Sequence, residues 1–126
     1  MLREMGPVRQ VRGEPRRRWF SSERCDLIVW LHEDGRPQGF QFCYDKDEVE
    51  HAATWRPSGE FSHMRVDYGA GIYGRPGTPF LIPDGAFDPG HLLSVFQREA
   101  SLVPGEIVEF VAGRLAALTA TEPADE

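Results

Sequence analysis

A series of short apolar segments separated by short turns, between residues 19 and 68, is the feature that most constrains the fold of this chain. The segments alternate apolar and polar residues or are rich in aromatic and β-branched types, which is typical of β-strands. They cover residues 25–32, 38–44, 51–56 and 61–68. Connections of only a few residues do not allow a parallel crossover, so the sequence predicts a four-stranded antiparallel β-meander.

The C-terminal part of the chain has the hydrophobic period of helices. Asp88 and Pro89 are a typical N-cap followed by proline at the first helical position, and Pro104 starts a second helical segment. The expected buried positions are Leu92, Leu93, Phe96 and Ala100 in the first helix and Ile107, Val108, Phe110, Val111, Leu115 and Leu118 in the second. We therefore predict an α+β fold in which two C-terminal α-helices pack on one face of the meander.

Charge is distributed unevenly along the 126 residues, a length typical of one domain. Residues 1–18 contain six arginines and two glutamates, a net charge of +4, whereas the rest contains eight basic and eighteen acidic side chains, a net charge of −10. We expect residues 1–18 to form a flexible basic arm, residues 19–118 the α+β domain, and residues 119–126 a disordered tail.

Cys25 and Cys43 are too few for a disulfide framework or a four-cysteine zinc site. No apolar run reaches the length of a membrane span, and residues 1–18 lack the apolar core of a secretory signal. We expect a cytoplasmic protein with free thiols and without a metal or cofactor. A G-x-G-x-x-G pattern at residues 69–74 does not predict a dinucleotide site, because Arg75-Pro76-Gly77 follows it instead of a helix.

The strand period of two assigns side chains to the two faces of the sheet once the hairpin loops are taken as even in length. The face expected under the helices collects Cys25, Leu27, Val29, Leu31, Phe40, Phe42, Tyr44, Val49, His51, Ala53, Trp55, Met64, Val66 and Tyr68. The opposite face collects Ile28, Trp30, His32, Gln41, Glu50, Ala52, Thr54, Phe61, His63, Arg65 and Asp67. The first loop is taken as either Asp34-Gly35 or Asp34 to Pro37, and the shorter version places Trp30 opposite Gly39; the third hairpin places Thr54 opposite His63.

One functional hypothesis is catalytic. Four polar residues expected on the helix-free face could act as acid, base and anion-positioning groups on a polar small molecule; they are Glu50, His63, Arg65 and Asp67. A solvated salt-bridge cluster is the simpler interpretation of the same residues. His51 is expected on the packed face, and it would join His63 as a metal pair on the other face only if the second hairpin were shifted by one residue.

The favoured hypothesis is a non-catalytic binding domain. Aromatic residues gather at one end of the helix-free face and in the Gly/Pro-rich segment 69–87, and exposed aromatics of this kind are typical of interfaces and ligand pockets. The expected binding surface consists of Trp30, Gln41, Phe61, Tyr73 and Phe80. We expect this surface to form a homodimer, or to bind a protein or small-molecule ligand. The alternative that segment 69–87 folds back to cover the sheet stays open.

The weakest hypothesis is contact with nucleic acid through Arg16, Arg17 and Arg18. A basic arm without a basic platform gives little affinity for a phosphate backbone, and the acidic remainder of the chain repels one.

Overall fold

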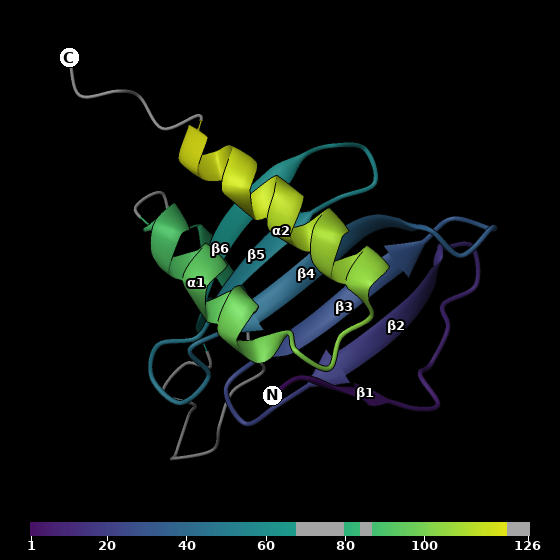
Figure 1. The fold of residues 1–126 in the computed structure, drawn as a ribbon, viewed down its shortest axis with the longest axis horizontal. Coiled ribbons are helices and arrows are strands. Elements are labelled where there is room, and N and C mark those ends of the chain that lie inside the picture. The colour runs from purple at the N-terminus through teal and green to yellow at the C-terminus, as the bar shows by residue number, and fades with distance from the viewer. Residues whose placement is uncertain (68–79, 84–86, 121–126) are drawn as a thin grey trace.

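The computed structural model describes residues 1–67, 80–83 and 87–120. In order, the elements are β1 (Arg3–Met5), β2 (Arg16–Ser21), β3 (Asp26–Leu31), β4 (Pro37–Tyr44), β5 (His51–Trp55), β6 (Phe61–Asp67), β7 (Phe80–Pro83), α1 (Pro89–Glu99) and α2 (Gly105–Ala120). The strands form one sheet in sequential order, and each neighbouring pair is antiparallel. The predicted α+β class and antiparallel meander are confirmed, although the described sheet has seven strands instead of four (Figure 1).

Both helices lie on the same side of the sheet, as predicted (Figure 1). Phe40 meets Phe110 of α2 at a centroid distance of 6.3 Å, and Phe42 meets Phe96 of α1 at 5.4 Å, both edge to face. Further fully buried side chains of this layer are Leu27, Val29, Leu92, Val111 and Leu115. Their burial removes enough apolar surface from water to fix the two helices on this face.

The start of α1 follows the predicted capping signal. The side chain of Asp88 accepts hydrogen bonds from the backbone N–H groups of Gly90 and His91, and Pro89 occupies the first turn. These contacts satisfy donors that a helix N-terminus otherwise leaves without partners. At the other end of the helical pair, α2 continues to Ala120, so the predicted start of a tail at residue 119 is wrong.

The predicted flexible arm over residues 1–18 is also wrong. The segment supplies strand β1 and the first half of β2, and Phe20 at the inner end of β2 lies opposite Leu27 with no exposed surface. Leu2 is fully buried as well, and its backbone N–H donates to the carbonyl of Glu99 at 2.9 Å. The high arginine content led to the prediction of a flexible arm, although alternate residues of β2 face the core.

An ion pair joins β1 and β2 on the helix-covered face of the sheet. The guanidinium of Arg18 contacts the carboxylate of Glu4 at 2.6 Å, and this hydrogen-bonded pairing lowers the pKa of Glu4. Both side chains are partly exposed to solvent, so the pair contributes little stability by itself. Its effect is to remove Arg18 from the set of charges available to an external anion.

The predicted face assignments at the first two hairpins are confirmed, and the loop between β4 and β5 covers residues 45–50, an even length. Trp30 lies opposite Gly39, as the sequence indicated. Along β4 and β5, Phe42 lies opposite Ala53 and Tyr44 opposite His51, so these residues share the helix-covered face. Because side chains alternate along each strand, Ile28, Gln41 and Thr54 face the other way, together with Trp30. Val49, assigned to the packed face, instead precedes β5 and is 54% exposed.

The predicted register of β5 and β6 is wrong by one residue. His63 lies opposite Ala53 instead of Thr54. Arg56 N–H donates to the carbonyl of Glu60, Gly59 N–H donates to that of Arg56, and Gly59 adopts a φ of 92°. The loop between the paired residues therefore has an odd length, with its last residue in the left-handed conformation that glycine favours.

This one-residue difference exchanges the two faces of β6. Phe61, His63 and Arg65 belong to the helix-covered side, and Ser62, Met64 and Val66 belong to the open side. The expected placement of Met64 and Val66 under the helices, and of His63 and Arg65 on the open face, is corrected by the same observation.

We predict that Leu2→Ala lowers the free energy of unfolding by about 3 kcal/mol, because it empties a fully enclosed site. Urea unfolding followed by circular dichroism measures the change. The matched control is Leu102→Ala, since Leu102 is 52% exposed and its truncation is expected to cost less than about 0.5 kcal/mol. Equal, small effects at the two leucines would mean that residues 1–5 do not dock on the folded domain.

Candidate functional site

The four residues expected to form an acid–base cluster do not meet on the open face. His63 is buried and Arg65 is exposed, both on the helix-covered side. The carbonyl of Glu50 accepts the N–H of Val66, at the start of the hairpin between β5 and β6. Asp67 ends β6, and its side chain lies outside the described residues. In the described part of the chain these residues do not share a site. Their catalytic role stays a prediction.

The shifted register instead brings His63 next to His51 under α1. The two imidazole rings stack at a centroid distance of 5.3 Å, and Phe87 covers His63 at 4.0 Å with an interplanar angle of 10°. The hydroxyl of Tyr44 forms a hydrogen bond with Nε2 of His63. The expectation that His51 faces the packed side is confirmed.

The histidines belong to a packed aromatic cluster. His91 lies at its rim, half-exposed, with Nε2 at 3.2 Å from the carboxylate of Asp45. Within the described ranges, no set of three histidine, cysteine or acidic side chains is arranged to hold a metal ion. Aromatic stacking and the Tyr44 hydrogen bond account for this cluster as part of the core.

The open face carries an apolar strip across its first three strands. Met5 of β1 lies opposite Trp19 of β2, which lies opposite Ile28 of β3. Trp30, two residues further along β3, occupies the same face and is partly exposed. These residues define what we call the tryptophan strip: Met5, Trp19, Ile28 and Trp30.

A hydrogen-bonded network orients the strip. The indole N–H of Trp19 donates to the carboxylate of Asp26 at 3.2 Å, and the hydroxyl of Ser21 donates to the same oxygen at 2.6 Å. The ammonium of Lys46 contacts the other carboxylate oxygen at 2.7 Å, and this hydrogen bond raises the pKa of Lys46. Trp19 is therefore held in one orientation with its ring on the sheet surface.

The predicted binding surface is placed only in part. Trp30 and Gln41 lie on the open face as expected, whereas Phe61 lies on the helix-covered side. Tyr73 and the side chain of Phe80 lie outside the described residues. Sequence reasoning missed Met5 because residues 1–18 were assigned to a flexible arm, and it missed Trp19 because the first predicted strand began at residue 25. The alternation of Arg18, Trp19 and Phe20 was the available signal.

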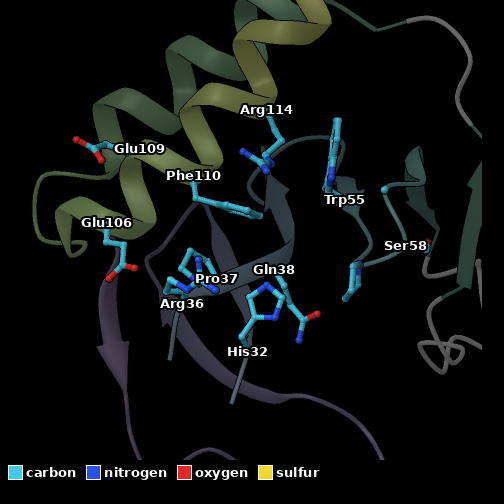
Figure 2. A pocket seen from close by; sticks show the side chains of 12 residues that line it. His32, Arg36, Pro37, Gln38, Trp55, Ser58, Glu106, Glu109, Phe110 and Arg114 are labelled. Carbon is cyan, nitrogen blue, oxygen red and sulfur yellow. The ribbon is translucent and has the colours of Figure 1, made fainter. Parts of the chain in front are cut away.

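A pocket of about 760 Å³ lies between α2 and the turns of two hairpins (Figure 2). Its aromatic walls are Phe110 of α2 and Trp55 at the end of β5. The guanidinium of Arg114 lies over the Phe110 ring at 3.9 Å and near the Trp55 ring at 5.9 Å. The size falls within the range of small-molecule sites, although the pocket opens widely to solvent.

The two cysteines are free thiols, as predicted. Burial raises the pKa of Cys25 to about 12, and nearby carboxylates, Glu99 first, add to the effect. Burial likewise raises the pKa of Cys43 to about 11. The thiol is favoured over the thiolate at both sites, so neither residue has the properties of a nucleophile.

Comparison with protein-family models, with curated proteins and with solved structures finds nothing that matches this chain. The helices of the described residues include none with the length and apolar character that crossing a membrane requires.

We predict that both thiols react slowly with Ellman's reagent at pH 8 in the folded protein. Raising a thiol pKa from about 8.5 to about 11 at Cys43 and about 12 at Cys25 lowers the thiolate fraction at pH 8 by about two and about three orders of magnitude, respectively. The same chain unfolded in guanidinium chloride is the control, and its thiols are expected to react at the ordinary rate. Equal rates before and after unfolding would contradict the burial of the two side chains.

Proposed function

We propose that this protein is an interaction domain that forms a homodimer through the helix-free face of its sheet. The observation that carries the proposal is the tryptophan strip, in which two partly exposed indoles share a sheet face that neither α1 nor α2 covers (Figure 1). Large aromatic side chains with a rigid orientation are the most frequent anchors of protein interfaces.

The connection between β1 and β2 runs beside the tryptophan strip and leaves the indoles accessible to a partner. Shallow pockets of about 280 and 290 Å³ lie beside Trp19 and Trp30, each bordered by residues of the connection between β1 and β2. The connection is tied to β2 by Gln10, whose side chain exchanges two hydrogen bonds with the backbone of Arg17. It therefore borders the strip and leaves concave sites beside the indoles, into which a partner's side chains fit.

A second copy is the partner that the composition of this face favours. Next to the strip, the same face carries Gln41 and Ser62, both partly exposed, with the buried Thr54 between them donating to Gln41. A twofold axis through the strip places the indoles of one copy against those of the other, with polar groups at the margin. An apolar centre with a polar rim is the usual arrangement of such interfaces.

The arginines of β2 favour this proposal over nucleic-acid binding. Arg16 and Arg18 project to the helix-covered side, and Arg17 projects to the open side. Arg18 is paired with Glu4, and Nε of Arg17 donates to the carbonyl of Arg9. Three consecutive cations thus point in alternate directions, and two of them already have partners.

A cytoplasmic location belongs to the same proposal. Cys25 and Cys43 are both thiols, on opposite faces of the sheet, and unpaired thiols are typical of a reducing compartment.

We predict that the wild-type protein sediments as a dimer at about 100 μM and that Ile28→Lys weakens the dimer more than tenfold, because an ammonium group would be buried without a partner. Sedimentation velocity over a dilution series measures both. Leu102→Lys is the matched control at an exposed residue outside the strip, and it is expected to leave the dimer intact. A wild-type chain that stays monomeric at several hundred micromolar would overturn the proposal.

A further inference from the structure

The pocket beside α2 owes its shape to two turns of the same type. The hairpins β3–β4 and β5–β6 each end in a loop whose glycine has a positive φ, Gly35 at 91° and Gly59 at 92°. Both loops border the pocket, facing α2 across it. Gly39 lets the second turn come close, because a Cβ there would lie 2.7 Å from the carbonyl oxygen of Trp55 and 3.0 Å from the ring of Pro57.

Arg114 is a cation that the described residues leave without a counterion. It forms no salt bridge with any residue that the structure describes, and its buried Nε has no hydrogen-bond partner there. The guanidinium is nevertheless held in place, because it stacks on Phe110 and lies beside Trp55 (Figure 2). A fixed guanidinium with free N–H donors is suited to bind a carboxylate with two hydrogen bonds.

An acidic group lies at the other end of the same helix stripe. Glu106, Phe110 and Arg114 follow one another at intervals of four residues along α2, so all three border the pocket. With a rise of 1.5 Å per residue, the backbones of Glu106 and Arg114 are about 12 Å apart. Glu106 forms no ion pair within the described part of the chain.

The other charged residues that line the pocket leave Glu106 at an acidic end and Arg114 at a cationic end. Arg36 is bound to Asp34 at 2.7 Å, and hydrogen bonds from the backbone and side chain of Arg36 lower the pKa of Asp34. Glu109, on the same helix as Glu106, also lines the pocket and strengthens its acidic end. The pocket therefore presents an acidic end, a central aromatic ring and a cationic end.

We infer that this pocket binds a short zwitterionic peptide of two or three residues. The peptide carboxylate binds Arg114, the terminal ammonium lies near Glu106, and an apolar side chain packs against Phe110. An extended chain advances about 3.3 Å per residue, so three residues span about 10 Å, close to the separation of about 12 Å between the backbones of Glu106 and Arg114. The acidic end disfavours nucleotides and other polyanions. The inference does not depend on the proposed dimer, because the pocket lies on the helix-covered side of the sheet.

The test uses the full-length ¹⁵N-labelled chain and the tripeptide Ala-Leu-Ala as the probe. In a titration followed by two-dimensional NMR, the indole N–H signal of Trp55 is expected to shift and saturate at millimolar peptide or below. The N-acetylated and the C-amidated tripeptides each lack one terminal charge, and each is expected to bind at least tenfold more weakly. No saturable shift of Trp55, or equal binding of the blocked peptides, would overturn the inference.

Two variants test separately the contact of the peptide carboxylate with Arg114 and that of the peptide ammonium with Glu106. Arg114→Gln is expected to reduce binding of Ala-Leu-Ala at least tenfold, whereas Arg98→Gln, at an exposed cation of α1, is expected to leave it unchanged. Glu106→Gln is expected to weaken the free tripeptide but not its N-acetylated form. If Arg114→Gln and Arg98→Gln bind equally well, the carboxylate contact is refuted. Because the readout is Trp55, failure here leaves the dimer proposal intact.

Discussion

The packing of two sheet phenylalanines against two helix phenylalanines is the interaction on which the rest of the structure depends. Phe40 and Phe42 are two residues apart on β4, so they share a face, and each meets a helix ring edge to face. Once this contact is made, strand alternation assigns the neighbouring strands through their registers. The indoles of Trp19 and Trp30 are left on the side without helices as a direct consequence.

Turn chemistry explains which part of the sheet the sequence could predict. The first hairpin has the same odd loop as the third, since His32 N–H donates to the carbonyl of Arg36 and Gly35 adopts a positive φ. A register shift next to Leu31 adds one residue on the other strand, Gln38, and restores the even count. The third hairpin has no such compensating residue, so the side chains of β6 point to the faces opposite to those predicted. Short sequence patterns do not distinguish these cases.

Predicting the open face and the pocket requires knowledge of contacts between residues that are far apart in the sequence. Charge composition concealed β1 and β2, whose strand character depends on Leu2 and Phe20 entering a core built by distant residues. The pocket brings Trp55 beside Arg114, and this depends on how α2 crosses the sheet. By contrast, the starts of the two helices followed from local signals, the Asp88 cap and Pro104 with the apolar period after them, and were predicted correctly.

The three tryptophans lie on two different surfaces, with Trp19 and Trp30 on the helix-free face that we propose to associate with a second copy and Trp55 in the pocket on the other side. Their indole N–H signals in a dilution series therefore test the central claim most directly. The signals of Trp19 and Trp30 are expected to move with protein concentration while that of Trp55 stays fixed. A concentration-dependent shift of Trp55 alone, or of none of the three, would contradict the division of the sheet into a packed face and an associating face.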